Sequence, residues 1–390
     1  PIGRWIRLRR VAPRPRGPLP RRRPRCLASV NRSEGGQMSF RTIQGGAAPR
    51  SGVTKLPHDR SDLLWSGGEP TPLFLDSIDR WVDAMVADEH GGGNGPDGLV
   101  KAIITAKAPG ILCGRPVAQR LLERHFPGCS IQWRVSEGGA VTNGDTLATL
   151  QGSAVGLLRL ERIMLNILGR LSGIATNTAR WVTAARPMQV AATRKTEWGL
   201  LDKWAVHIGG GLTHRLGRSD ALMIKENDLA AMTEEGEDAI VAIQRVISSV
   251  DMDVHAGFTI IEVQKYGQAK AAAKAWRESQ LTRGGDEKLV IMLDNMEPHI
   301  AYQVYRDFTL WGRERRYAYG PEQEHHGGLI RYCILEASGG IVFESLEDWR
   351  GVGDADGIRK GSTGVDLVSS SALNMGVPSL DMSMLIGGGE

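Results

Sequence analysis

Four basic residues stand close together in the stretch ATRKTEWGLLDKWAVHIGGGLTHRLG, residues 192–217. Arg194 and Lys195 lie near its start, and His214 and Arg215 near its end, on either side of a predicted amphipathic helix. Solvated helices usually scatter both signs of charge along one face, whereas these cations gather at the two ends. Arg and Lys together suit a carboxylate or a phosphate, because Arg binds both through paired hydrogen bonds. The stretch therefore predicts a site for a small anion.

Six short apolar runs in the second half of the chain each end in polar or charged residues and then give way to a helical segment. They are MQVAATRKT, DALMIKEN, FTIIEVQK, LVIMLDN, YCILEASGG and VDLVSSS. Buried parallel strands have this composition, and strands alternating with helices are typical of a parallel sheet or barrel. Barrel chemistry gathers at the carboxyl ends of the strands. The side chains expected there are Arg194, Lys195, Lys225, Glu226, Glu262, Asp294, Ser338 and Ser369.

A single charged residue at a strand end ordinarily faces solvent. Six apolar runs that all end in polar or charged residues instead favour a shared site. Glu262 and Asp294 end neighbouring predicted strands, where they could hold magnesium, bind sugar hydroxyls or remain ordinary solvated carboxylates. The segment EASGG resembles a phosphate-binding turn, because small residues let backbone N–H groups approach oxygens. By itself that last signal is weak.

A polar stripe crosses the segment LLRLERIMLNILGRLSG, which is apolar almost all round and predicts a buried helix. Arg162, Asn166 and Arg170 recur in it at four-residue spacing. A buried arginine needs an internal carboxylate or a bound anion, and Glu161 lies elsewhere on the helix. Arg162 is therefore predicted to serve a ligand or a subunit interface.

The first half of the chain has a different pattern. A helical pattern runs from Leu63 to Ala87, glycines interrupt it at 91–98, and several strands with one short helix, PVAQRLLERHF, follow. This half predicts a small α/β sandwich. Farther along, His325 and His326 lie in a polar stretch that we interpret as a loop or a subunit contact rather than a metal site.

Charge is unevenly distributed along the 390 residues. Residues 1–33 contain eleven Arg and no acid, and the remainder carries 37 basic against 44 acidic residues. An acidic body argues against a general nucleic-acid surface. No apolar run approaches the ~20 residues of a membrane span, so we expect neither a nucleic acid nor a membrane as partner.

The Pro- and Arg-rich head is expected to be disordered over residues 1–60. It could be an organelle transit peptide, a nucleic-acid-binding arm, or sequence upstream of the true start. The last is favoured because the chain does not begin with Met and Met38 precedes ordinary sequence. The scattered cysteines, Cys26, Cys113, Cys129 and Cys333, indicate a reducing compartment, and we expect a cytoplasmic protein.

Several blocks of the chain together resemble a known family. ERIMLNILGRLSGIAT, TRKT, KWAVHIGGGLTHRLG, SDALMIKEN, IMLDN and LEASGGI are similar, in order, to blocks of the quinolinate phosphoribosyltransferases. The resemblance runs from about Leu63 to Ile386. It implies an α/β protein with an N-terminal α/β sandwich, residues 61–174, and an incomplete, about seven-stranded parallel α/β barrel with a returning C-terminal segment, residues 175–390.

The resemblance also implies what the site residues do. The family's cationic acid pocket corresponds to Arg162, contributed across a dimer, with Arg194, Lys195, His214, Arg215 and Lys225. Glu262 and Asp294 correspond to the residues that bind the ribose and the magnesium of phosphoribosyl pyrophosphate. The 5-phosphate site corresponds to Ser338, Gly339, Gly340, Ser369 and Ser371.

The implied activity is transfer of phosphoribose from phosphoribosyl pyrophosphate to quinolinate, with decarboxylation to nicotinate mononucleotide. Lys195, Glu262 and Asp294 would be the catalytic residues, Mg²⁺ the cofactor, and a homodimer or hexamer with shared active sites the assembly. Ala192, Trp198, Asp228 and Ser371 depart from the common pattern of the family.

Two other functions stay open at this point. One is a related phosphoribosyltransferase acting on nicotinate or another aromatic acid. The other is a nucleic-acid-binding protein that uses the basic head.

Overall fold

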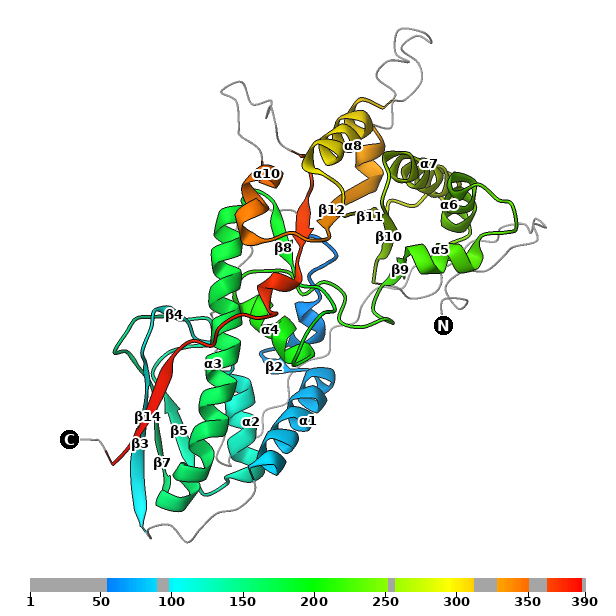
Figure 1. The fold of residues 1–390 in the computed structure, drawn as a ribbon. Coiled ribbons are helices and arrows are strands. Elements are labelled where there is room, and N and C mark those ends of the chain that lie inside the picture. The colour runs from blue at the N-terminus through cyan, green and yellow to red at the C-terminus, as the bar shows by residue number, and fades with distance from the viewer. Residues whose placement is uncertain (1–54, 90–97, 252–256, 312–327, 351–362, 388–390) are drawn as a thin grey trace, which may run out of the picture.

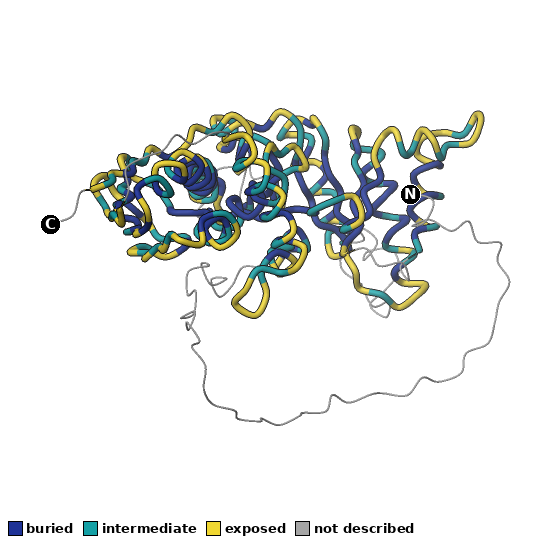
Figure 2. The backbone as a smooth tube through the Cα atoms, turned by 90° about the horizontal axis from the view of Figure 1, so that it is seen from below, coloured by how far each residue is buried: buried dark blue, intermediate teal, exposed yellow. Residues whose placement is uncertain are grey.

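The computed structural model describes residues 55–89, 98–251, 257–311, 328–350 and 363–387. They form two parts, a parallel sheet flanked by helices and an antiparallel sheet with its own helices, which a single long helix connects (Figure 1). Buried residues fill the interior of both parts, and exposed ones lie on their outer turns (Figure 2).

The parallel sheet has six strands in the order β8-β13-β12-β11-β10-β9. Their bounds are β8 Gln189–Ala191, β9 Leu222–Ile224, β10 Thr259–Val263, β11 Leu289–Asp294, β12 Cys333–Ser338 and β13 Leu367–Ser369. Each lies within one of the six apolar runs, so the predicted parallel architecture is confirmed. Beyond the six strands, the described residues show one parallel bridge, between Ala191 and Leu212, where a further strand would adjoin β8.

Helices follow the strands, and most of them lie on the outer side of this sheet, while the first and the last pack against the long connecting helix (Figure 1). They are α4 Leu200–Ile208, α5 Glu226–Met232, α6 Ala239–Ser248, α7 Tyr266–Arg283, α8 Pro298–Leu310 and α10 Leu346–Arg350. In α6 the Asp238 side chain caps the first turn, and Ala242, Ile243, Val246 and Ile247 form one buried stripe. Apolar residues at this spacing fix which side of a helix faces the sheet.

The antiparallel sheet has the order β14-β3-β7-β5, with β3 Leu99–Ala106, β5 Ser130–Trp133, β7 Thr146–Ser153 and β14 Met382–Ile386. Its edge strand β14 is the last strand of the chain and pairs Met384 with Ile104. The C-terminal segment therefore returns to the N-terminal sheet. Two short pairs accompany it, β1 Trp65–Ser66 with β2 Glu69–Pro70, and β4 Gly110–Ile111 with β6 Ala140–Val141.

Helices α1 Pro72–Asp88 and α2 Arg115–His125 pack on this part. The helix predicted from Leu63 begins later, because Thr71 caps α1 through its side chain and Pro72 occupies the first position. The long helix α3, Ala154–Ala185, runs through residue 174, where the sequence had placed the domain boundary. None of the helices in the described ranges is long and apolar enough to cross a membrane.

The expectation of a disordered head up to residue 60 is wrong at its C-terminal end. Leu56 and His58 are buried, and Leu56 belongs to the apolar cluster inside the barrel. Arg60 forms an ion pair with Asp220 at 2.8 Å. Residues 55–60 are thus part of the barrel, while residues 1–54 lie outside the described residues, as do His325 and His326.

Candidate active site

A cavity of about 610 Å³ lies at the carboxyl ends of the parallel strands. Every strand contributes to it, either through its last residues or through the loop that follows. The contributing side chains include Thr193 after β8, Lys225 after β9, Glu262 on β10, Asp294 on β11, Ser338 on β12 and Ser369 on β13. The strand-end residues that the sequence singled out therefore do meet at one place, apart from Glu226, which does not line this cavity.

Strand alternation explains why these side chains point inward. On β11, Val290 and Met292 belong to the apolar cluster inside the barrel, so Asp294 is the next inward position. Asp294 pairs in register with Ser338 on the neighbouring strand. Glu262 pairs with Met292 instead, which places Glu262 one layer deeper. The two carboxylates therefore lie at different depths of the same cavity.

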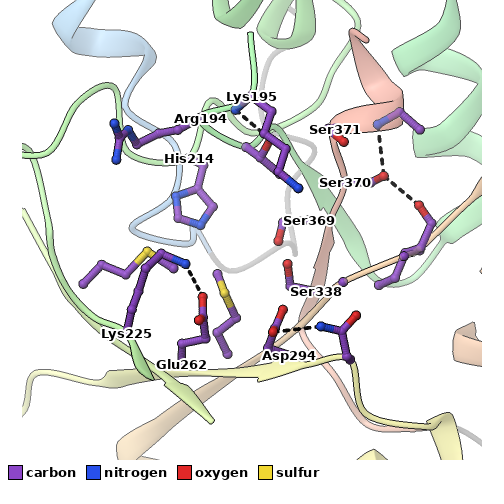
Figure 3. A pocket seen from close by; sticks show the side chains of 18 of the residues that line it. Arg194, Lys195, His214, Lys225, Glu262, Asp294, Ser338, Ser369, Ser370 and Ser371 are labelled. Carbon is purple, nitrogen blue, oxygen red and sulfur yellow. Dashed lines mark hydrogen bonds and ion pairs between the residues drawn. The ribbon is translucent and has the colours of Figure 1, made fainter. Parts of the chain in front are cut away.

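Opposite sides of the cavity differ in chemistry (Figure 3). Arg194, Lys195, His214 and Lys225 stand on one side, and the labelled serines on the other, with Glu262 and Asp294 between them. We call the first side the basic wall, comprising Arg194, Lys195, His214, Arg215 and Lys225. The second is the serine wall, comprising Ser338–Gly340 and Ser369–Ser371.

Three cations of the basic wall have no carboxylate within ion-pair distance among the described residues. They are Arg194, Lys195 and Arg215. Burial, together with the positive charges of Arg194 and Arg218, lowers the pKa of Arg215 to about 10, so Arg215 is still charged at neutral pH. Cations that repel one another at the mouth of a cavity create a strong local attraction for anions.

The acidic residues already have neighbours in the cavity. Lys225 forms an ion pair with Glu262, and the Asn295 side-chain amide donates to Asp294 Oδ2 at 2.9 Å. Both carboxylates keep oxygens directed into the cavity (Figure 3). Oxygen ligands of this kind suit Mg²⁺, which usually keeps several waters and takes one or two protein carboxylates.

The serine wall has two features that suit a phosphate. Ser369 is buried, lines the cavity, and its Oγ has no hydrogen-bond partner among the described residues. Gly339 has φ +90°, and a Cβ there would lie 2.4 Å from Asn295 Oδ1, so only glycine fits this turn. Ser370 Oγ donates to the Ile341 carbonyl at 2.7 Å and accepts from the Ala372 amide at 3.1 Å, which joins the two loops.

Buried polar residues hold the loop that carries Lys195. The Asn374 side-chain amide donates to the Lys195 carbonyl at 2.9 Å. Asp202, at the start of α4 and fully buried, accepts from the backbone amides of Glu197 and Trp198 and from Asn374. These contacts hold the loop in the conformation that presents Lys195 to the cavity.

Arg170 of the predicted polar stripe belongs to this same network. It pairs with Asp202 at 3.0 Å and with Glu197 at 2.6 Å, and it lies over the Trp198 ring. Trp198, one of the departures from the family pattern, also stacks on Trp81 of α1 at 5.8 Å. Trp198 thus joins the basic wall to the N-terminal part of the chain.

His214 lines the cavity, and both of its ring nitrogens have hydrogen-bond partners beneath the basic wall. Its Nε2 lies 3.1 Å from Glu336 Oε1, and its Nδ1 accepts from the Arg215 backbone amide at 2.7 Å. Burial also lowers the pKa of His214 despite the neighbouring carboxylate of Glu336. Both the burial and the hydrogen bond accepted by Nδ1 favour the neutral imidazole.

Arg162, like Glu226, is a predicted site residue that lies away from the cavity. The sequence suggested a buried arginine, but Arg162 is exposed on α3, and the described residues provide no ion pair for it. The helix turns its apolar sides inward and leaves the stripe of Arg162 and Asn166 facing solvent.

Several functional neighbours were missed by the sequence reasoning. Glu336 could have been found, because it interrupts an otherwise apolar buried strand. Asp202 and Asn374 carry no local signal, since their importance comes from contacts with distant segments.

The structure combines a parallel α/β barrel, with basic residues at the mouth of its cavity, and an antiparallel domain that includes the last strand of the chain. This combination defines a class of two-domain α/β-barrel proteins. Two family profiles match the chain: "Quinolinate phosphoribosyl transferase, N-terminal domain" at residues 85–172 and "Quinolinate phosphoribosyl transferase, C-terminal domain" at 174–385. The chain belongs to the quinolinate phosphoribosyltransferase family.

Individual relatives agree with this assignment. A probable nicotinate-nucleotide pyrophosphorylase [carboxylating] of Methanothermobacter thermautotrophicus is 33% identical over 74% of this chain and 89% of its own. Quinolinate phosphoribosyltransferase [decarboxylating] 2a, mitochondrial, of Nicotiana tabacum is 30% identical over 72% of both chains. The crystal structure of NadC from Streptococcus pyogenes has a TM-score of 0.61 at 29% identity, over 81% of this chain and 97% of that one.

Proposed function

We propose that this protein transfers phosphoribose from phosphoribosyl pyrophosphate to the ring nitrogen of quinolinate and releases the 2-carboxylate, giving nicotinate mononucleotide, pyrophosphate and CO₂. One observation carries the proposal: Arg194, Lys195 and Arg215, which have no carboxylate partner in the described part of the chain, share a cavity with two carboxylates and a serine wall. A diacid, a sugar and a phosphate are the groups that such an arrangement accommodates together. The names of the two relatives describe the same reaction.

The number of cations in the basic wall favours a substrate with two carboxylates over one with a single carboxylate. An aromatic acid in the basic wall would contact several cations, and one carboxylate leaves some of them desolvated without a partner. Quinolinate has two carboxylates on neighbouring ring carbons, which provide partners for both Arg215 and Lys195. A charge-assisted hydrogen bond contributes roughly 1.5–3 kcal/mol, so the second carboxylate has a large effect on affinity.

The donor would occupy the rest of the cavity. Its 5-phosphate would be bound by the serine wall, where the buried Ser369 hydroxyl is available, and its ribose hydroxyls by Glu262 and Asp294. The same two carboxylates would hold Mg²⁺, which when bound neutralises charge on the departing pyrophosphate.

The chemistry requires no strong base. The lone pair of the quinolinate nitrogen forms the bond to the ribose C1, while the C1–oxygen bond breaks and its electron pair leaves with pyrophosphate. Arg194 and Lys195 would orient the acid, and Glu262 and Asp294 would stabilise the positive charge that develops on the ribose. The carbon–carboxylate bond then breaks, and its electrons stay on the cationic ring until that carbon takes a proton.

We further propose a homodimer or hexamer in which Arg162 of one subunit reaches the cavity of another. The support is that Arg162 is charged, exposed and free of ion pairs within the described part of its own chain. The three free cysteines of the described residues support a reducing compartment such as the cytoplasm.

Steady-state assays with quinolinate and with nicotinate test the proposed function. Nicotinate has one carboxylate fewer than quinolinate, so one or two cations of the basic wall would lose their partner. Nicotinate should therefore be about 10- to 10⁴-fold poorer as a substrate. Phthalate, which has the two carboxylates but lacks the ring nitrogen, should compete with quinolinate without reacting. If nicotinate is used as well as quinolinate, the protein is instead a phosphoribosyltransferase for aromatic monoacids.

A further inference from the structure

We propose that Glu336 and His58 are positioning residues for acid binding: they hold His214 as the neutral imidazole protonated at Nε2, so that His214 Nδ1 fixes the backbone of Arg215 at the cavity mouth. The inference deepens the proposed function and rests on it, because its effect is read through quinolinate affinity. Neither Glu336 nor His58 lines the cavity.

The three side chains form one buried hydrogen-bonded group beneath the basic wall. Glu336 Oε2 lies 3.0 Å from His58 Nε2, and Glu336 Oε1 lies 3.1 Å from His214 Nε2. His58 and Glu336 are 0% exposed and His214 is 4% exposed. The two imidazole rings meet edge to face with centroids 5.0 Å apart, and Phe258 packs against both. Water therefore does not compete for these contacts.

The hydrogen bonds leave one protonation pattern for His214. Its Nδ1 accepts the backbone N–H of Arg215, so Nδ1 carries no proton. The proton of the neutral ring is then on Nε2, where it is donated to Glu336. His58 likewise donates from Nε2 to the other carboxylate oxygen, because two acceptors facing each other would repel.

An ionised carboxylate is required between two N–H donors. Burial alone would raise the pKa of Glu336, but its contact with His214 and the hydrogen bond from His58 hold it well below its ordinary value. The other charged groups that act on the two imidazoles are Lys203, which faces His214, and Asp366, which faces His58. A neutral amide could accept from one imidazole only and would present its own donors to the other.

The group is connected to the basic wall through the segment Thr213–Arg215. Thr213 Oγ1 donates to the His58 carbonyl at 3.2 Å and accepts from the Arg60 amide at 2.8 Å, and Lys203 Nζ donates to the Thr213 carbonyl at 2.6 Å. His214 itself has φ +53°, a left-handed conformation that a histidine keeps only when its surroundings fix it. The contacts of His58 and Glu336 provide that fixation.

The alternative use of such a group is to bind a metal ion, since two imidazoles and a carboxylate lie with their ligand atoms within 4.8 Å of one another. A metal bound at Nε2 needs the tautomer protonated at Nδ1, and the Arg215 amide occupies Nδ1 of His214. The hydrogen-bonding pattern therefore favours the positioning role.

The experiment compares four variants of the full chain: Glu336→Gln, His58→Leu, His58→Gln and the control Ile260→Ala. Ile260 is fully buried inside the same barrel but takes no part in the hydrogen-bonded group and does not line the cavity. For each we would measure KM for quinolinate and for phosphoribosyl pyrophosphate, kcat, the phthalate Kd and the melting temperature.

Glu336→Gln and His58→Leu should raise the KM for quinolinate and the phthalate Kd about tenfold, with little change in the KM for phosphoribosyl pyrophosphate. His58→Gln, which keeps a donor for Glu336, should recover most of this loss. Ile260→Ala should lower the melting temperature without changing acid affinity. Equal changes for both substrates, or unchanged acid affinity in a destabilised His58→Leu protein, would overturn the proposal.

Two measurements on the unmodified protein keep the test decisive if the variants fail to fold. Nitrogen-15 NMR of the imidazoles should show His214 neutral and protonated at Nε2 at pH 7. A charged or Nδ1-protonated ring, or a stoichiometric transition metal whose removal changes acid affinity, would contradict the proposal. Failure of the unmodified protein to bind phthalate or to use quinolinate would instead contradict the proposed function.

Discussion

The two walls of the cavity reach their geometry in different ways. The positions that would serve the donor follow from strand register: Asp294 and Ser338 are paired neighbours on β11 and β12, and Glu262 is the inward residue one layer deeper on β10. Most of the basic wall stands on loops, with Lys195 after β8 and Arg215 beyond α4. Hydrogen bonds from buried side chains hold these loops.

This difference determines which substitutions should impair each wall. Strand-end positions are fixed by the whole sheet, so an isosteric change there removes chemistry and leaves geometry intact. The basic wall depends on particular side chains outside the cavity, such as Asn374 and Glu336. Substitutions of such supporting residues should weaken acid binding although no group inside the cavity is removed.

The largest effect is expected from Asp294→Asn. Because Asp294 would stabilise charge that develops on the ribose, kcat/KM for phosphoribosyl pyrophosphate should fall by about 10²- to 10³-fold. Steady-state kinetics measures this loss, and calorimetry with quinolinate alone should show nearly unchanged binding. Equal loss for both substrates would mean that the walls are not separate.

Lys195→Ala and Arg215→Ala should each weaken quinolinate binding about 10- to 100-fold, because each removes a charge-assisted contact to a carboxylate. The preference for quinolinate over nicotinate should shrink at the same time. Assays with both acids measure it, and Ser371→Gly on the opposite wall provides a control that keeps the preference. If a variant turns over more slowly but keeps the full preference for quinolinate over nicotinate, the substituted residue does not contact the acid.

Arg162→Ala should raise the quinolinate requirement about tenfold if Arg162 reaches a carboxylate across a subunit interface. Because Arg162 is exposed within its own chain, stability should change by less than about 0.5 kcal/mol. Light scattering and thermal unfolding provide the checks on assembly and fold. A marked fall in melting temperature with unchanged affinity would refute the ligand role.

The smallest effect is expected from Asp202→Asn, which weakens the support of the Lys195 loop without touching the cavity. Loss of the charge opposite Arg170 should raise the KM for quinolinate about 2- to 10-fold and leave the KM for phosphoribosyl pyrophosphate unchanged. Substrate-resolved kinetics would show it. A loss confined to phosphoribosyl pyrophosphate would reverse the assignment of the two walls.

The sequence predicted the strands well because their signal is local. Each apolar run is short, is bounded by polar residues and alternates with a helix, and this pattern needs no knowledge of distant contacts. Predictions that depended on burial were less successful. Arg162 was predicted to be buried from the apolar composition of its helix, but composition does not show which side of a long helix stays exposed.

By itself the sequence determined the parallel sheet and the ring of strand-end residues, since strand alternation and the carboxyl-end rule follow from the chain alone. Only the tertiary structure decided the charge state of His214 and which residues support the basic wall. His58 meets Glu336 across 278 residues of sequence, and Asn374 meets Lys195 across 179. Such contacts leave no periodic trace, because they arise when separately formed elements pack and exclude water, which then fixes tautomers and ion pairs.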